Sequence, residues 1–152
     1  MTTETPETFD LSNDLPSYVD DAVAALRIPE DDRQMIDAIA DGILDKKGHD
    51  LRILDVRAIH SVFDYFVVVT ANNPRQMRTI ADAVEESARV RCGVKKRSIE
   101  GLQGEAWTLI DFGGVAVNIF SAEARSFYAL ERLWADAPTV DFAEAAASLQ
   151  TN

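Results

Sequence analysis

The sequence predicts an α/β fold in which a mixed β-sheet of about five strands packs against helices. Three observations support this prediction. Apolar residues recur at helical spacing in three segments, five short runs are rich in β-branched and aromatic residues, and the order is α, β, β, α, β, β, β, α. Because strands occur both singly and as hairpins, we expect one mixed sheet with helices packed on it.

The first helix of the core is expected over residues 32–47. Asp31 and Asp32 are good capping residues for its start. Lys46 and Lys47 lie in its last turn, where positive charge is favourable, and Gly48 can supply a left-handed stop. One apolar stripe runs along this helix and is formed by Ile36, Ile39, Ala40, Ile43 and Leu44.

Two strands and a second helix follow. The runs "LRILDV" (51–56) and "YFVVVT" (65–70) have the length and composition of strands. Asn73 can then cap a helix whose first residue is Pro74, the position at which a missing N–H does least harm. This helix is expected to end at Gly93, with its inward face formed by Met77, Ile80, Ala81, Val84 and Ala88.

The second half of the core is expected to form three short strands and a last helix. The strands are predicted over 96–100, 106–111 and 115–120, with turns at Gly101/Gly104 and at Gly113–Gly114. Ser121 caps a helix over 122–134, and Pro138 ends the core. The chain therefore divides into an acidic extension (1–30), a core domain (31–138) and a C-terminal tail (139–152).

The two ends of the chain are expected to be accessory. The extension is predicted to be partly disordered, with apolar spacing that allows a short helix over 17–27. Phe142, Ala145, Ala146 and Leu149 allow a frayed helix in the tail. We interpret the acidic extension as a solvating segment, with a self-masking arm as a more speculative alternative.

The formal net charge of −11 belongs mainly to these ends. Residues 1–32 hold nine acids and one base, residues 135–152 hold three acids and no base, and residues 33–134 hold fourteen of each. A neutral core lacks the excess of lysine and arginine that direct phosphate binding requires. We therefore expect no sequence-specific nucleic-acid partner.

The sequence also bears on the compartment. The run "YFVVV" is far too short to span a bilayer, and "MTTETPETFD" lacks the basic start and apolar region of a signal peptide. Cys92 is the single cysteine, so no intramolecular disulfide can form, in keeping with a reducing compartment. We expect a cytoplasmic protein without a membrane partner.

The last helix contains more aromatic residues than its core stripe accommodates. At about 100° per residue, Phe127, Leu130, Leu133 and Trp134 fall within one arc and are expected to be buried. Tyr128 falls outside this arc, between Arg125 and Arg132. Either Tyr128 lies on the surface and stacks with an arginine, or it belongs to a recognition face, since Tyr and Arg are enriched in hot spots.

The predicted hairpin over 106–120 carries large apolar groups on both faces. Trp107, Leu109 and Asp111 share one side of the first strand. Val115, Val117 and Ile119 form a smooth core side of the second, whereas Ala116, Asn118 and Phe120 form a less regular one. Either helices cover both faces of the sheet, or one face meets another protein.

The sequence does not group its potentially catalytic or metal-binding residues into a recognisable site. His49 and His60 lie near predicted loops without cysteines at metal spacing, which favours surface or capping roles. Cys92 lies at a helix C-terminus, where the helix dipole disfavours a thiolate. Asp55, Asp64 and Asp111 each stand alone near a strand end. We expect no catalytic residue, metal ligand or cofactor; a magnesium-dependent nucleotidyltransferase-like enzyme using these three aspartates is the alternative.

Several motifs resemble one known family. They are "DYF" (64–66), "RQ" (75–76), "EG" (100–101), W-x-L-x-D (107–111) and E-x-R-x-F-Y-x-L-E-x-L-W (123–134). Together they resemble the ribosomal silencing factor family, also called Iojap-like proteins, over about residues 33–138. The resemblance implies a fold similar to nucleotidyltransferases without their catalytic acids. The chain departs from the family at Gly114, where Asp is frequent, and at Asn118, where His is frequent.

The resemblance also implies a function and a partner. The protein would bind the large ribosomal subunit, chiefly through its ribosomal protein fourteen, block joining of the small subunit, and damp translation when nutrients are short. A large-subunit assembly factor is the alternative, and a homodimer is credible. From sidedness, we expect the interface to comprise Asp64, Trp107, Leu109, Asp111, Arg125, Tyr128, Glu131 and Arg132.

Overall fold

The computed structural model describes residues 27–101 and 106–142. The chain divides into two compact units, residues 1–33 and 34–152, and the sheet and site described below belong to the second. The expected helices over 17–27 and within the tail, and the turn residue Gly104, lie outside the described residues. The elements are α3 (Glu30–Asp45), β1 (His49–Asp55), β2 (Tyr65–Ala71), α4 (Pro74–Cys92), β3 (Ser98–Glu100), β4 (Trp107–Asp111), β5 (Val115–Ser121), α5 (Ala122–Tyr128) and α6 (Leu130–Leu133).

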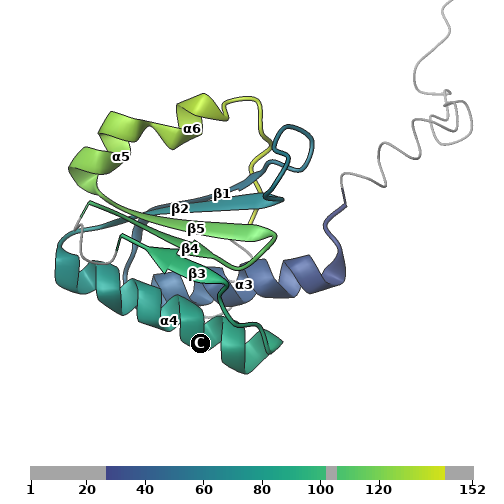
Figure 1. Ribbon diagram of the computed structural model, residues 1–152, viewed down its shortest axis with the longest axis horizontal. Coiled ribbons are helices and arrows are strands. Elements are labelled where there is room, and N and C mark those ends of the chain that lie inside the picture. The colour runs from purple at the N-terminus through teal and green to yellow at the C-terminus, as the bar shows by residue number, and fades with distance from the viewer. Residues whose placement is uncertain (1–26, 102–105, 143–152) are drawn as a thin grey trace, which may run out of the picture. The chain divides into compact units, whose positions relative to one another are not determined.

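The strands form one mixed sheet in the order β1-β2-β5-β4-β3, which confirms the predicted fold class (Figure 1). β2 and β5 are parallel, with Val67 opposite Val117, and the other three neighbouring pairs are antiparallel. Two parallel strands cannot be joined by a tight turn. The chain between β2 and β5 instead contains α4 and the β3–β4 pair, which takes up the outer edge of the sheet.

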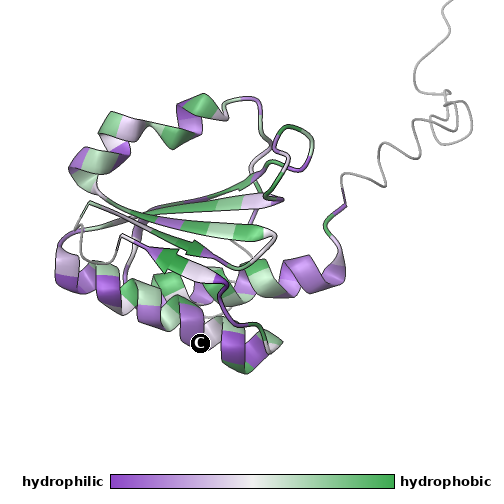
Figure 2. Cartoon of the chain, in the orientation of Figure 1, coloured by the Kyte–Doolittle hydropathy of each residue, from purple (hydrophilic) through white to green (hydrophobic). Residues whose placement is uncertain are grey.

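Helices lie against both faces of the sheet. α3 and α4 cover one face, and α5 and α6 lie against the other (Figure 1). The strands are mostly hydrophobic, whereas α4 has hydrophilic residues between its hydrophobic ones, as a helix with one buried side requires (Figure 2). The core against α3 and α4 contains Ile53, Val67, Val69, Ile110, Val117 and Ile119 from the sheet, all fully buried.

α4 has the ends that the sequence predicts. The side chain of Asn73 accepts a hydrogen bond of 2.8 Å from the Gln76 N–H, and Gly93 adopts a left-handed φ of 68°. Gln76 also connects the two helices on this face, because its Nε2 donates to the carbonyls of Lys46 and Lys47 at 3.1 and 3.0 Å. The "RQ" motif therefore joins the end of α3 to the start of α4.

The end of α3 differs from the prediction. α3 ends at Asp45, and the left-handed residue is Lys47, with φ 64°, rather than Gly48. Gly48 is required by packing instead, since a Cβ there would lie 2.6 Å from Cγ2 of Val69 and 2.7 Å from Cγ2 of Ile43. The sequence correctly indicates that the helix ends near this point. The glycine is needed, however, because α3 and β2 leave no space for a side chain at position 48.

The expected continuous helix over 122–134 is wrong. α5 ends at Tyr128, Ala129 adopts a left-handed conformation (φ 48°, ψ 49°), and α6 follows as a short helix. The helical period is lost across Ala129, so the expected burial of Phe127 and Leu133 is also wrong: they are 80% and 70% exposed. Trp134 is only partly buried, and it packs against a cluster of Leu54, Val56, Phe66, Ala116 and Ala137.

The chain after α6 runs beside the edge strand β1. The Asp55 N–H donates to the Pro138 carbonyl at 2.8 Å, and the Val140 N–H donates to the Ile53 carbonyl at 2.7 Å. Thr139 forms an isolated antiparallel bridge with Leu54. These contacts cover an edge whose backbone groups would otherwise be available for pairing.

No helix within residues 27–101 and 106–142 is long and apolar enough to cross a membrane.

Candidate functional site

Four aromatic side chains from β4, β5 and α5 gather on the face of the sheet that carries the short helices. We call Trp107, Phe120, Phe127 and Tyr128 the aromatic patch. The Trp107 ring lies 4.8 Å from that of Phe120 and 4.7 Å from that of Tyr128, and Phe127 meets Tyr128 edge-on at 5.0 Å. Phe120 is fully buried, Trp107 is half-buried and Tyr128 is 49% exposed. The patch therefore has a buried base and an open outer surface.

The local structure of α5 places Tyr128 over the sheet. Ser121 caps the helix by accepting a hydrogen bond of 3.1 Å from the Ala124 N–H. Ala129 then turns the chain away, so Tyr128 is the last residue of α5 and rests on Trp107 instead of lying between Arg125 and Arg132. The expected surface exposure of Tyr128 is confirmed, but its predicted position between two arginines is wrong.

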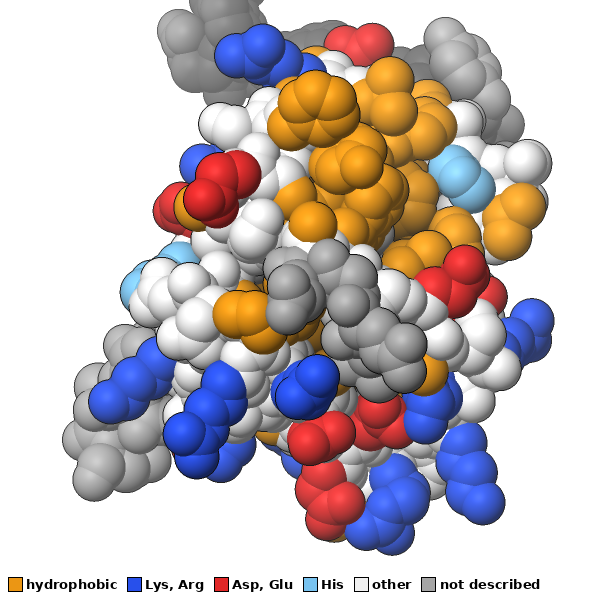
Figure 3. Space-filling model, turned by 60° about the vertical axis from the view of Figure 1, so that its left-hand side comes forward, with side chains coloured by type: hydrophobic (Ala, Val, Ile, Leu, Met, Phe, Trp, Pro, Cys, Tyr) orange, Lys and Arg blue, Asp and Glu red, His pale blue; other side chains and the backbone are white. Residues whose placement is uncertain are grey.

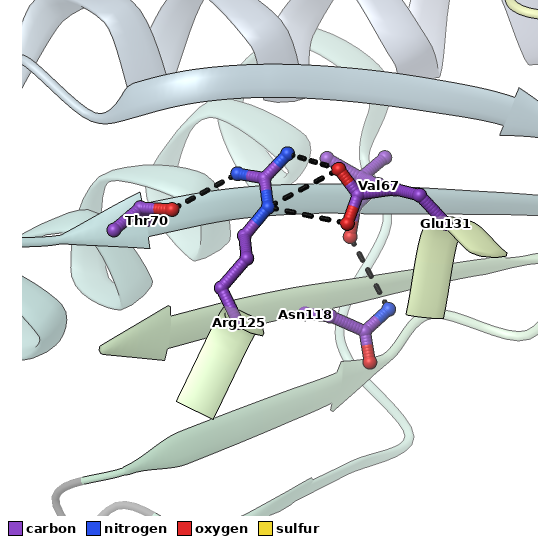
Figure 4. A network of polar contacts seen from close by, with 5 residues as sticks. All are labelled: Val67, Thr70, Asn118, Arg125 and Glu131. Carbon is purple, nitrogen blue, oxygen red and sulfur yellow. Dashed lines mark hydrogen bonds and ion pairs between the residues drawn. The ribbon is translucent and has the colours of Figure 1, made fainter. Parts of the chain in front are cut away.

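A buried asparagine lies beneath the patch. The Oδ1 of Asn118 accepts a hydrogen bond of 3.1 Å from the indole Nε1–H of Trp107. The Nδ2 of Asn118 donates to the carbonyls of Val67 and Ala116 at 3.2 and 3.3 Å; the bond to Val67 is visible in Figure 4. We did not predict this residue as part of the site, although an amide within the apolar run "VAVNIF" is a signal that could have identified it.

A second aromatic cluster lies beside the first and includes His60. The His60 ring is 5.1 to 5.5 Å from the rings of Phe63, Phe66 and Trp134. Its Nδ1 accepts hydrogen bonds from the N–H groups of Val62 and Phe63 at 3.0 and 2.9 Å, which confirms the expected capping role. Leu109 packs against the cluster that contains Phe66. Apolar side chains gather in the upper part of the surface shown in Figure 3, with a histidine at their edge.

Arg125, Glu131 and Arg132 line a separate hollow on the β1 side of α5. This open hollow of about 540 Å³ is also lined by Asp50, Arg52 and Thr70. The Arg125 Nη2 lies 2.6 Å from Oε2 of Glu131, and its Nη1 donates to the Thr70 hydroxyl at 3.0 Å (Figure 4). Arg125 is only 12% exposed, so its side chain ties α5 to α6 and to the sheet.

The three strand-end aspartates lie at one end of the sheet, and each has different neighbours. Arg57 binds both carboxylate oxygens of Asp55, at 2.9 and 2.7 Å. Asp111 accepts a hydrogen bond of 2.7 Å from the Gly113 N–H, within the turn between β4 and β5. Asp64 is exposed beside Gly114. Among the described residues, no group of three or more His, Cys, Asp or Glu side chains is arranged to hold a metal ion.

Comparison with a family model gives a match over residues 29–152, to a family described as "Ribosomal silencing factor during starvation". The chain is 37% identical over 97 residues to a ribosomal silencing factor of Bacillus subtilis, covering 64% of this chain and 81% of that protein. It is 36% identical over 100 residues to one from Treponema pallidum, covering 65% and 88%. The family is named for a silencing factor and not for an enzyme.

Solved structures agree with this assignment. A crystal structure from Bacillus halodurans superposes with a TM-score of 0.63 at 29% identity, covering 72% of this chain and 98% of the other. One from Chromobacterium violaceum gives 0.61 at 30% identity, covering 72% and 88%. The matched sequence model, the relatives and the fold agree, and the chain therefore belongs to the ribosomal silencing factor family.

Proposed function

We propose that this protein binds the large ribosomal subunit, chiefly through its ribosomal protein fourteen, and sterically blocks joining of the small subunit. Family membership supports a role at the ribosome. The observation that carries the proposal is the ring contact of exposed Tyr128 with half-buried Trp107, beside the exposed ring of Phe127. Exposed aromatic groups gathered in one patch are typical of protein-binding sites.

The aromatic patch would form the centre of the interface. Trp and Tyr contribute large contact areas with few rotatable bonds, so they lose little conformational freedom on binding. Leu109 would extend this centre toward the second aromatic cluster. Asp64 and Asp111 would lie at one side as a polar rim, and Arg132 at the other, beyond the Arg125–Glu131 pair.

The mechanism requires no covalent chemistry. A domain seated on the joining face of the large subunit occupies space that the small subunit needs, and this would damp translation when nutrients are short. Association with ribosomes supports a cytoplasmic location. A homodimer would bury the aromatic patch between two copies until the large subunit competes for it.

The test uses purified ribosomal subunits and sucrose gradients. With saturating protein, we expect fewer joined ribosomes, with the protein co-sedimenting with mature free large subunits and absent from joined ribosomes. Undiminished joining would contradict the proposal. Co-sedimentation with immature large subunits alone would support the assembly-factor alternative, and thermal stabilisation by a magnesium nucleotide would support the nucleotidyltransferase alternative.

A further inference from the structure

We propose that Asn118 is a positioning residue that holds the Trp107 indole in one orientation, so that Trp107 offers a partner its carbon surface and not its N–H group. The inference rests on the proposed function, because it concerns the same aromatic patch. It specifies the chemistry of the partner group that lies on Trp107. That group is an apolar side chain or the flat face of a guanidinium, rather than a hydrogen-bond acceptor.

The orientation of the Asn118 amide is set by the backbone. Asn118 is 2% exposed, so water does not satisfy its polar atoms. Its Nδ2 faces two carbonyl oxygens, those of Val67 and Ala116. An amide turned by 180° would place Oδ1 against both carbonyls, and three acceptors would then face one another without a donor. Oδ1 must therefore face Trp107.

The amide in turn sets the orientation of the indole. Nε1–H is the single polar group of a tryptophan side chain, and it is a donor only. In this structure it donates to Asn118, while the ring packs against Phe120 and Tyr128. Turning the indole over would remove its N–H from Asn118 and leave the buried Oδ1 without a donor, which is unfavourable because a buried acceptor loses its hydrogen bond. One orientation is thus strongly preferred before any partner binds.

The consequence is a preorganised and chemically simple surface. Because the indole N–H is already used, the exposed part of Trp107 consists of carbon. A partner that carried an acceptor to this point would lose its water and gain no hydrogen bond. The role requires a neutral acceptor at position 118 and no charge, and the asparagine amide oxygen supplies this.

The first test concerns the free protein. The chain has two tryptophans, Trp107 and Trp134, so two indole N–H signals are expected in an ¹⁵N-correlation spectrum. Asn118→Leu should speed hydrogen exchange of the Trp107 indole at least tenfold and leave that of Trp134 unchanged. Asn118→Ala is the second variant if the leucine does not fold. An unchanged exchange rate for Trp107 in a folded variant overturns the proposal.

Thr108→Val is the matched control. Thr108 is fully buried on the neighbouring strand, and its hydroxyl has no hydrogen-bond partner among the described residues. This substitution also removes a buried polar group from the sheet, but not one that contacts the indole. It should leave exchange of both indole N–H groups unchanged, and faster exchange at Trp107 alone in this variant would overturn the assignment to Asn118.

The second test is a double-mutant cycle on large-subunit binding. Trp107→Phe keeps an aromatic carbon surface and removes the N–H, so it should bind within about fivefold of wild type. Asn118→Leu should weaken binding about tenfold in the wild-type background and less than twofold in the Trp107→Phe background. An equal loss in both backgrounds overturns the positioning role. A loss with Trp107→Phe as large as that with Trp107→Ala overturns the carbon-surface role.

Failure of the proposed function would give a different result from failure of the positioning role of Asn118. If folded Trp107→Ala and Tyr128→Ala variants both bind the large subunit like wild type, the aromatic patch is not the interface. That outcome overturns the proposed contact whatever the exchange data show. The exchange measurement needs no ribosome, so it still decides whether Asn118 holds the indole.

Discussion

Arg125 and Glu131 form an ion pair across a break in the segment that the sequence predicts as one helix. The Nη2 of Arg125 lies 2.6 Å from Oε2 of Glu131, although six positions separate the two residues. In an unbroken helix, neighbours on one face are three or four positions apart. The left-handed turn at Ala129 is what brings the pair together, and the pair closes the turn.

The first prediction concerns Ala129. An L-residue other than glycine in the left-handed region costs about 1 kcal/mol or more, and glycine removes that cost. Ala129→Gly should therefore unfold at the same or a slightly higher temperature than wild type. Ala129→Val should lower the free energy of unfolding by more than about 1 kcal/mol, since β-branched residues adopt this region poorly. Thermal unfolding of the three proteins measures both effects, and a clear loss of stability in Ala129→Gly would contradict the strain.

The second prediction concerns Glu131 and pH. Burial raises the pKa of Glu131, but the hydrogen bond and charge of Arg125 more than offset this, and the pKa lies below its ordinary value of 4.5. Because the folded-state pKa is the lower one, ionised Glu131 stabilises the fold above the unfolded-state pKa. That contribution is lost as pH falls through the folded-state pKa.

Glu131→Gln removes this titration. Its melting temperature should lie below that of wild type by a constant amount between about pH 6 and 8, and the gap should shrink as pH falls below the ordinary glutamate pKa of 4.5. Melting curves across this range measure the gap. A gap that widens toward acid pH would show that the pair does not lower the pKa of Glu131.

The third prediction concerns Tyr128. Tyr128→Ala removes the outer ring of the aromatic patch, and it should weaken large-subunit binding by about 2 kcal/mol or more, roughly thirtyfold. Arg132→Ala, at an exposed rim position, should cost about 1 kcal/mol or less. Co-sedimentation titrations with purified large subunits measure both.

The control for Tyr128 is an exposed apolar residue elsewhere. Val90 is 62% exposed on α4, which covers the other face of the sheet, and Val90→Ala should bind like wild type. Wild-type affinity in a folded Tyr128→Ala variant would mean that the interface lies on another surface.

The fourth prediction separates two reasons for glycine. At Gly48, a Cβ would lie 2.6 Å from a methyl group of Val69, so Gly48→Ala should lower the free energy of unfolding by about 1–3 kcal/mol through overpacking. At Gly93 a Cβ would meet no atom within 4 Å, but φ is 68°, so Gly93→Ala should cost only about 1 kcal/mol of backbone strain. Chemical denaturation compares the two, and a cost at Gly48 no larger than that at Gly93 would rule out the packing explanation.

Much of the fold could be predicted because its signals are local. Asn73, Pro74 and Gly93 mark the ends of α4 within a few residues of chain, and the structure places the helix between them. The alternation of Val115, Val117 and Ile119 likewise predicts one apolar side of β5, although Ala116, Asn118 and Phe120 on the other side are buried as well. Such signals can be recognised in the sequence because capping and side-chain alternation depend on near neighbours along the chain.

The candidate site was predicted less completely, because it depends on contacts between distant segments. Trp107 and Tyr128 were both expected in the interface, yet nothing in their spacing shows that their rings touch. Asn118 was not assigned to the site, because its role depends on Trp107 from β4 and on a carbonyl from β2. Such a role appears only when three strands are placed side by side.

By itself, the sequence determined the class of the fold, the order of the strands and helices up to the start of α5, and the family to which the protein is related. These follow from hydrophobic periodicity, capping residues and short motifs, which are properties of neighbouring residues. Only the tertiary structure decided that the last helix breaks at Ala129, that Phe127 faces outward, and that Arg125 is bound to Glu131 and Thr70. An alanine carries no local signal to end a helix, so contacts with the sheet and across the turn had to impose that conformation.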